Sequence, residues 1–407
     1  MARGPAVTLY NLFPKWYYFS FMKQHLKKRI FLDYASATPV LDEVQKAMNP
    51  FFAAQFENPS ALYAEAVEVR RVVQESRKAI ANVLKAHNDE IVFTGSGTEA
   101  DNLAIFGVAG PLTLKRPHII LSPFEHSAIR KAAQVFIDRG GSVSLLPVYH
   151  DGRVRADDVK KLITRRTVLV SVMYANNEIG TIQPVKDIAK VIRHYNKANS
   201  CRILFHTDAS QAANYLSLNV LELGVDLMTL DASKVYGPKG IGLLFVKRGI
   251  ELSPQIVGGG QEAKRRSGTE NVPGIVGFAA ALILVQSDRG QESKRLCALR
   301  DFALDSIVKT FPHSQVNGSR VERLPNNINV CIKGIDAEFT TLKLDARGFA
   351  VSTSSSCEAQ SDDPRSIAVD SLGDLGCAVS SLRITVGRPT TKNDVVSFIA
   401  ALKKVLT

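Results

Sequence analysis

Short apolar runs alternate with amphipathic stretches along most of the chain. Between residues 90 and 246 the apolar runs are EIVFT, HIILS, SVSLLPV, TVLVSVMYA, RILFHTD, LMTLD and GIGLLFV. Stretches with helical periodicity separate them, for example VKDIAKVIRHYNKA at 185–198. Such alternation is typical of βα units around a mostly parallel sheet. The pattern therefore predicts an α/β protein.

The pattern changes at about residue 290. A long helical stretch, SKRLCALRDFALDSIVKTF, is followed by the antiparallel-looking run NNINVCIKG, a Ser-rich loop, and a closing strand and helix. We expect a large domain at 29–288 and a smaller α+β domain at 289–407. The first residues of the large domain are expected to pack with the small one. Residues 1–28 form a separate basic, aromatic leader.

Charge is spread unevenly over the 407 residues. The net charge is +12, and the segment 1–32 contains six basic residues and no acid. Half of the net charge thus lies in the segment 1–32, which argues against nucleic-acid binding by the folded body. The leader suits either a membrane-surface or targeting segment or a poorly ordered extension. The longest apolar run, 272–285, contains Pro273 and is too short to span a bilayer, so we expect a buried helix and no membrane span.

Five cysteines are scattered without C-x-x-C spacing, at positions 201, 297, 331, 357 and 377. The odd count and the spacing argue against a disulfide framework and against a metal site. A reducing, cytoplasmic setting is expected. Cys357 lies in AVSTSSSCEAQSDDPRS and has polar neighbours on both sides. It is therefore expected to be accessible, whereas the other four are expected to be core or incidental residues.

Polar residues follow the ends of the predicted strands, where ligands bind in such sheets. GSGTEA at 95–100 has two interpretations. It loosely matches a dinucleotide fingerprint with Glu125 as the ribose acid. Alternatively it is a phosphate cup, in which Gly97 and Thr98 offer N–H groups and a hydroxyl at a helix N-terminus. Both interpretations place an anion here.

Lys234 follows a strand and stands 26 residues after Asp208, which also follows a strand. Alone, Lys234 would be a surface charge and Asp208 a helix N-cap. Together they are the pair that pyridoxal phosphate requires, a lysine that carries the aldehyde and a carboxylate that keeps the ring nitrogen protonated. His126 is either a core histidine or a ring-stacking imidazole. Arg383 is either a surface charge or a clamp for a substrate carboxylate.

Taken together, the motifs resemble those of the cysteine desulfurases, which are fold-type I pyridoxal-phosphate enzymes of aminotransferase class V. The resemblance extends from about residue 30 to the C-terminus. It rests on DYASATPV (33–40), ENPSALY (57–63), GSGTEADNLAI (95–105), EHSAI (125–129), NNEIGTIQPV (176–185), HTDASQ (206–211), SKVYGPKGIG (233–242), GGGQE and RRSGTEN (258–271) and LRITVGR (382–388).

The resemblance implies a set of cofactor residues. Lys234 would carry the pyridoxal aldehyde, Asp208 would face the ring nitrogen, Gln211 would bind the ring oxygen, and His126 would stack on the ring and shuttle protons. Gly97, Thr98 and Ser233 would bind the phosphate, and Asn177 would also contact the cofactor. Thr269 resembles a phosphate ligand donated by a second subunit, which implies a homodimer.

For the reaction, the resemblance implies conversion of L-cysteine to L-alanine. Asn177 and Arg383 would hold the substrate carboxylate, and Cys357 would accept the sulfur as a persulfide. The sulfur would then pass to an acceptor protein, such as an iron–sulfur scaffold, or to tRNA thiolation. The alternatives are a selenocysteine lyase or another class V lyase, and a non-catalytic sulfur-trafficking scaffold.

The chain departs from the family pattern at several positions. Asp231-Ala232-Ser233 precedes the lysine where the family usually has Ser-Gly-His. An acid there is expected to repel the phosphate unless its side chain turns away. Ala263 replaces an arginine, Tyr63 replaces a histidine, and Glu358 follows Cys357.

Overall fold

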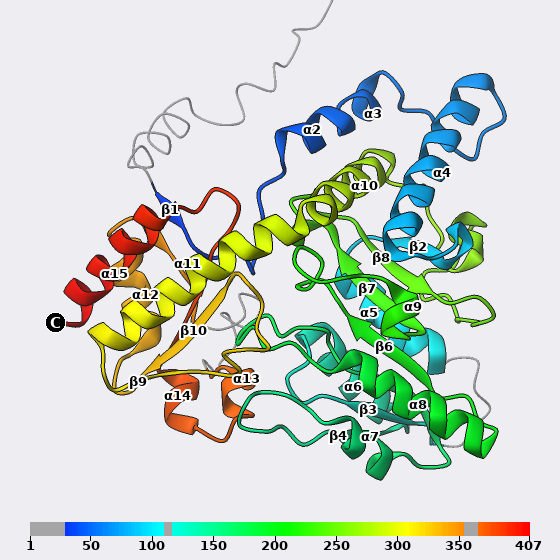
Figure 1. The fold of residues 1–407 in the computed structure, drawn as a ribbon. Coiled ribbons are helices and arrows are strands. Elements are labelled where there is room, and N and C mark those ends of the chain that lie inside the picture. Colours follow the sequence, from blue (N-terminus) through cyan, green and yellow to red (C-terminus); the bar gives the residue numbers. More distant parts are fainter. Residues whose placement is uncertain (1–28, 110–115, 354–364) are drawn as a thin grey trace, which may run out of the picture.

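A computed structural model describes residues 29–109, 116–353 and 365–407. A seven-stranded sheet forms the centre of its larger part (Figure 1). The strand order is β2-β8-β7-β6-β5-β3-β4, and only β8 runs antiparallel to both of its neighbours. The strands are β2 (Ile91–Thr94), β3 (His118–Leu121), β4 (Ser142–Leu145), β5 (Thr167–Ser171), β6 (Leu204–Asp208), β7 (Leu227–Asp231) and β8 (Gly242–Val246). Each of the seven apolar runs contains one of these strands.

Buried side chains lie on both faces of this sheet, which explains why its strands are nearly continuous apolar runs. Successive residues of a strand point to opposite faces. Accordingly Ile91 and Phe93 belong to one apolar cluster and Val92 to another. The helices of this part are α2 (Asp42–Met48), α3 (Pro50–Ala53), α4 (Ala64–Leu84), α5 (Gly97–Ala109), α6 (Ser127–Asp138), α7 (Ala156–Leu162), α8 (Val185–Asn199), α9 (Val220–Leu223) and α10 (Val272–Ser287), with 3-10 turns η2 (Asn88–Glu90), η3 (Ala232–Lys234) and η4 (Gln261–Lys264).

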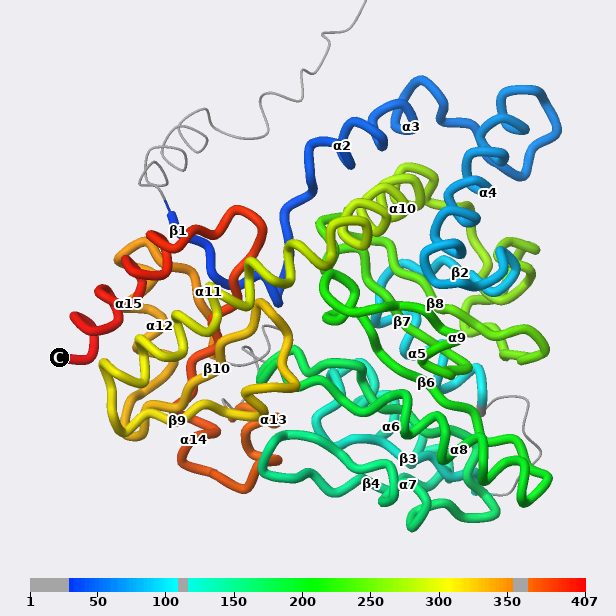
Figure 2. The backbone as a smooth tube through the Cα atoms, viewed as in Figure 1, coloured from blue at the N-terminus to red at the C-terminus, as the bar shows by residue number. Residues whose placement is uncertain are grey.

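The C-terminal part contains a second, antiparallel sheet of order β12-β10-β9. Its strands are β9 (Ser314–Val316), β10 (Asn327–Ile332) and β12 (Ser381–Thr385), and its helices are α11 (Arg289–Thr310), α12 (Ala337–Asp345), α13 (Ile367–Asp370), α14 (Leu375–Val379) and α15 (Lys392–Leu406). The backbone trace in Figure 2 shows α11 running from the end of α10 into this part. The short strand β1 (Ile30–Phe31) pairs in parallel with β11 (Phe349–Ala350), so the start of the described chain packs with the C-terminal elements.

One disulfide joins Cys331 of β10 to Cys377 of α14, with their Cα atoms 5.3 Å apart. The count and spacing of the cysteines argued against disulfides, and for this pair that expectation is wrong. Both side chains are fully buried, as expected, but β10 and α14 bring them face to face. Spacing along the sequence could not show this, because 46 residues separate them.

Helix α10 contains the apolar run at 272–285 and buries Phe278 and Leu282 among other residues, as expected. Among the described residues no single helix is both long and apolar enough to cross a membrane. Only α10 and α11 taken together would be long and apolar enough, and a 70° bend separates these two helices.

Candidate active site

A cavity of about 210 Å³ lies at the carboxyl ends of the central strands. The residues that follow β2, β3, β5, β6 and β7 converge there, because carboxyl ends of parallel strands meet at one edge of a sheet. Of the predicted site residues that the structure describes, all except Thr269 line it. The lining consists of Ala35, Ser36, Gly97, Thr98, Asp101, His126, Met173, Ala175, Asn177, Asp208, Ser210, Gln211, Asp231, Ser233, Lys234 and Arg383.

Lys234 and Asp208 face this cavity from neighbouring strands. Lys234 ends the 3-10 turn after β7, and its half-buried side chain donates a hydrogen bond from Nζ to the backbone oxygen of Ser36. Asp208 ends β6, is 9% exposed, and accepts a hydrogen bond from the Ser210 N–H at 2.9 Å. Because β6 and β7 are adjacent and parallel, the two side chains lie at the same edge of the sheet although they are 26 residues apart in the sequence.

His126 and Gln211 lie on the same cavity. His126 is the N-cap of α6, and its Nδ1 accepts a hydrogen bond from the Ala128 N–H at 3.2 Å. This bond assigns the proton of the neutral ring to Nε2. The imidazole is half-buried, so it is not a core histidine. Gln211 donates from Nε2 to the backbone oxygen of Ala35 at 2.9 Å.

Arg383 is 1% exposed, which excludes the interpretation as a surface charge. Its Nη2 donates to Asp33 Oδ1 at 2.8 Å, and its Nη1 donates to the backbone oxygen of Asn177 at 3.3 Å. The side chain thus reaches the cavity from β12, and these two hydrogen bonds help to fix its orientation. Sequence reasoning missed Asp33, and only its place in the DYASATPV motif pointed to it.

The phosphate cup expected at Gly97, Thr98 and Ser233 holds a carboxylate of the chain itself. Asp231 Oδ2 accepts from the Gly97 N–H at 2.8 Å, and Asp231 Oδ1 accepts from the N–H of Ser233 at 2.8 Å and from its hydroxyl at 2.6 Å. The acid has not turned away from the cup. Its oxygens bind two of the three groups that were assigned to the phosphate.

At the cavity lies a group of buried polar residues that sequence reasoning did not identify, and one of them, Asp101, lines the cavity itself. His206 contacts Ser171 Oγ at 2.8 Å and Thr229 Oγ1 at 3.0 Å, and burial lowers the pKa of its imidazole to about 3. Asp101 lies 3.8 Å from His206, and burial, reinforced by the charge of Asp208, raises the pKa of the Asp101 carboxyl well above its usual range. Burial therefore disfavours the charged form of both groups.

Glu125 is also buried, and its Oε1 accepts hydrogen bonds from Ser122 Oγ at 2.5 Å and from the Met173 N–H at 2.7 Å. Burial raises the pKa of this carboxyl to about 8. A carboxylate that binds a ribose must reach the ligand. The Glu125 carboxyl instead binds Ser122 and the Met173 backbone, so the dinucleotide interpretation fails.

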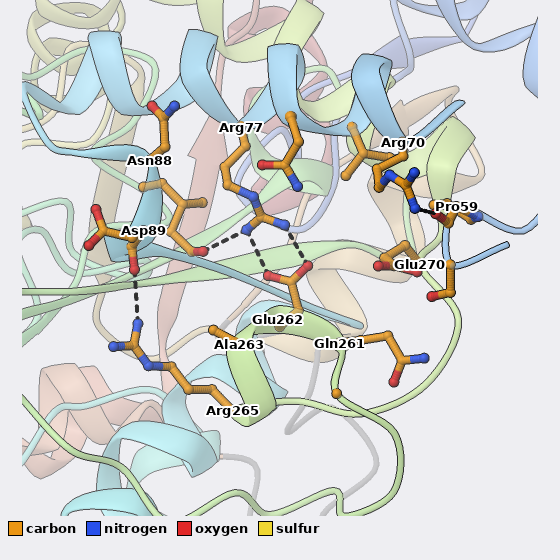
Figure 3. A pocket seen from close by; sticks show the side chains of 15 residues that line it. Pro59, Arg70, Arg77, Asn88, Asp89, Gln261, Glu262, Ala263, Arg265 and Glu270 are labelled. Carbon is orange, nitrogen blue, oxygen red and sulfur yellow. Dashed lines mark hydrogen bonds and ion pairs between the residues drawn. The ribbon is translucent and has the colours of Figure 1, made fainter. Parts of the chain in front are cut away.

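Thr269 does not line the cavity. It belongs to the loop at 258–271 and contributes to a smaller hollow with Thr94, Gly95 and Arg266. The same loop borders a larger cavity of about 570 Å³ (Figure 3). There Glu262 forms a bidentate ion pair with Arg77 of α4, with N–O distances of 2.7 and 2.8 Å.

The loop is anchored further by the N–H of Phe93, which donates to Glu262 Oε2 at 2.9 Å. Glu262, Ala263 and Lys264 all have φ between 48° and 66°, so three successive non-glycine residues adopt the left-handed region. The ion pair and the Phe93 bond hold this strained turn.

Cys357 and Glu358 lie outside the described residues, as does the leader at 1–28. Within the described part of the chain no group of three or more His, Cys, Asp or Glu side chains is placed to hold a metal ion.

The fold and the lysine–aspartate pair at the strand ends are those expected of a fold-type I pyridoxal-phosphate enzyme, and comparison with known families identifies the family. A model of the family "Aminotransferase class-V" matches residues 30–398, and the chain belongs to this family. The curated cysteine desulfurase IscS of Dictyoglomus turgidum is 40% identical over 381 residues, which cover 94% of this chain and 95% of the relative. The cysteine desulfurase IscS of Methanosarcina thermophila is 37% identical over 385 residues, which cover 93% of this chain and 92% of that relative. Within class V the chain is thus a member of the cysteine desulfurases.

Solved structures agree. A "NifS-like protein" matches with a TM-score of 0.86 and 30% identity, covering 93% of this chain and 99% of that chain. A structure titled "SspA in complex with cysteine" matches with a TM-score of 0.77 and 32% identity, covering 88% and 98%. The resemblance, the fold class and the enzyme class expected from the sequence are therefore confirmed. The roles of the individual site residues remain predictions.

Proposed function

We propose that this protein is a pyridoxal-phosphate-dependent cysteine desulfurase that converts L-cysteine to L-alanine and leaves the sulfur on Cys357. The observation that carries the proposal is the placement of Lys234 and Asp208 on one cavity, at the ends of adjacent parallel strands. The ring end of the cavity fits the cofactor. The phosphate end has suitable donors in Gly97, Thr98 and Ser233, although Asp231 now binds two of them.

When bound, pyridoxal phosphate supplies an electron sink for the bonds at the substrate Cα. Lys234 would hold its aldehyde carbon, and Asp208 would keep the ring nitrogen protonated. His126 would cover the ring face and move a proton through Nε2, because its Nδ1 is held by the Ala128 N–H. Gln211 would bind the ring oxygen.

Arg383 would bind the substrate carboxylate, with Asn177 beside it. The guanidinium suits this role because its planar fork binds a carboxylate in two places. Asp33 and the Asn177 carbonyl keep the fork in position, which reduces the conformational entropy lost when substrate binds. Since Asp33 also neutralises part of the charge, the substrate must share Arg383 with it.

The sulfur transfer balances without an outside oxidant. The C–S bond of the substrate breaks, and an S–S bond forms between the substrate sulfur and Cys357. The sulfur is oxidised to the persulfide level, while the substrate Cβ is reduced and takes up one thiol proton to become the methyl group of alanine. A thiolate is the suitable soft acceptor for this sulfur. A sulfur-acceptor protein such as an iron–sulfur scaffold is the proposed partner, and the cytoplasm the proposed location. A second copy of the chain would complete the phosphate site through Thr269.

The experiment is alanine formation from L-cysteine by protein loaded with the cofactor, with and without reductant. We expect turnover that Lys234→Ala abolishes while the circular dichroism spectrum is unchanged. Cys357→Ser should retain cofactor but form almost no alanine, whereas Cys201→Ser should keep most of the activity because Cys201 is exposed and does not line the cavity. Absence of turnover in the wild type, or full turnover with selenocysteine alone, would reject the proposal.

A further inference from the structure

The N-terminus of α5 is the natural place for a phosphate in this cavity. The first N–H groups of a helix have no partner within the helix, and together with the helix dipole they attract an anion. In this chain the Gly97 N–H, the first of α5, donates to Asp231 Oδ2 at 2.8 Å. The position is therefore filled by an internal anion.

The other oxygen of Asp231 binds the second part of the cup. Oδ1 accepts both the N–H and the hydroxyl hydrogen of Ser233. These two oxygens and three donors form a closed set that links the end of β7 to the start of α5. Gly97 lies close to this carboxylate, since a Cβ at position 97 would come within 3.2 Å of Asp231 Oδ2.

The charges around the first turn of α5 do not offset the acid. Glu99 lies on the same first turn of α5, and its carboxylate is bound by the Gly95 N–H at 2.7 Å and by Arg266 at 2.9 Å. Arg266 is thus engaged by an acid of the chain before any phosphate arrives. Asp208 adds a further acid to the cavity lining.

We propose that Asp231 is an internal competitor for the phosphate subsite, so that a cofactor phosphate binds only after Asp231 releases Gly97 and Ser233. This inference rests on the proposed function, because it takes pyridoxal phosphate as the cofactor. It means that the phosphate adds less to the affinity of the wild-type protein than it would without Asp231.

The test compares cofactor-free wild type with Asp231→Ser and Asp231→Asn. Serine removes the acid and supplies a hydroxyl donor, and asparagine keeps the size but replaces one oxygen by an amide donor. Binding is titrated by absorbance with pyridoxal phosphate and with pyridoxal, which lacks the phosphate, and by calorimetry with inorganic phosphate. Glu222→Gln is the matched control, because it removes one acid from the exposed surface of α9.

We expect both Asp231 variants to bind pyridoxal phosphate and inorganic phosphate about tenfold more tightly or better, because charged hydrogen bonds become available to the ligand. Affinity for pyridoxal should stay within about twofold of wild type, and Glu222→Gln should change none of the three. The melting temperature shows whether each variant folds. If one of the two Asp231 variants does not fold, the binding data of the other one test the inference.

Two results would overturn the inference. One is wild-type preference for pyridoxal phosphate over pyridoxal that neither variant increases. The other is unchanged binding of inorganic phosphate in both variants. If wild type takes up neither pyridoxal nor pyridoxal phosphate, the proposed function fails, but the phosphate titration still decides whether Asp231 blocks the cup.

Discussion

At the scale of single residues, burial decides the protonation of the acids around the cavity more than their mutual spacing does. Glu125 illustrates this, because both of its hydrogen bonds end on Oε1 while Oε2 is buried without a hydrogen-bond partner. A proton on Oε2 removes the cost of burying the charge. Accordingly burial raises the pKa of Glu125 from 4.5 to about 8.

This predicts a pH-dependent stability that Glu125→Gln removes. The unfolded chain loses the Glu125 proton near pH 4.5, whereas the folded protein keeps it up to about pH 8. The folded state therefore binds more protons between these values, and this residue lowers the free energy of unfolding as pH rises, by up to about 1.4 kcal/mol per pH unit. Glutamine keeps the acceptor at Oε1 and does not ionise.

Urea unfolding near pH 5 and near pH 8 measures the effect. Relative to wild type, Glu125→Gln should gain stability toward pH 8, and the exposed-acid control Glu222→Gln should follow the wild-type profile. Parallel profiles for wild type and Glu125→Gln would show that Glu125 is already ionised at pH 5.

The sequence could predict the positions of the site residues but not the contacts between their side chains. The strand-end positions of Lys234, Asp208 and His126 followed from the βα pattern, because that pattern fixes which residues reach the sheet edge. The contact of Arg383 with Asp33 did not follow, since 350 residues separate the two. Nor did the side-chain direction of Asp231, which depends on its distance to Gly97 in the folded protein.

At the scale of elements, apolar runs were a reliable guide because strands buried on both faces have few polar residues. Every predicted run between residues 90 and 246 contains a strand of the central sheet. The reversed direction of β8 was not predicted, because strand direction depends on the path of the connection and not on composition. The pairing of β1 with β11 joins segments more than 300 residues apart, and no periodicity reports such a contact.

An element-scale prediction concerns the ion pair that attaches the turn η4 to α4. Arg77 and Glu262 side chains are 10% and 3% exposed, and Arg77 also donates to the Ile91 backbone oxygen at 2.7 Å. Removing one partner of a buried pair leaves the other charge without compensation, which typically costs about 3–5 kcal/mol. We therefore expect Glu262→Gln to lower the free energy of unfolding by about that amount.

Chemical unfolding of a double-mutant cycle measures the coupling. Arg77→Met combined with Glu262→Gln should cost less than the sum of the single changes, because the double variant leaves no unpaired charge. The matched control is Glu75→Gln, which removes an exposed partner of Arg71 on the same helix and should have little effect. Additive single effects would mean that the two side chains contribute independently.

At the scale of the whole molecule, the cofactor site of one chain is incomplete if Thr269 acts as the family resemblance implies. Thr269 lies in a hollow of its own and not in the cavity that contains Lys234. The Arg77–Glu262 pair holds Glu262 of the same loop against α4. A second copy of the chain is the proposed source of the missing ligand.

A subunit-mixing experiment tests this proposal. Thr269→Ala should bind pyridoxal phosphate about three- to tenfold more weakly than wild type, because one hydrogen bond to the phosphate is lost, and should bind pyridoxal equally well. Lys234→Ala should fail to attach the cofactor covalently. When the two variants are mixed and allowed to exchange subunits, each mixed dimer contains one site with Lys234 from one chain and Thr269 from the other. Half of the sites in these dimers should therefore regain wild-type affinity, measured by absorbance titration on dimers confirmed by light scattering. A monomeric protein, or a mixture that behaves as the sum of its parts, would place Thr269 in the site of its own chain or in no site at all.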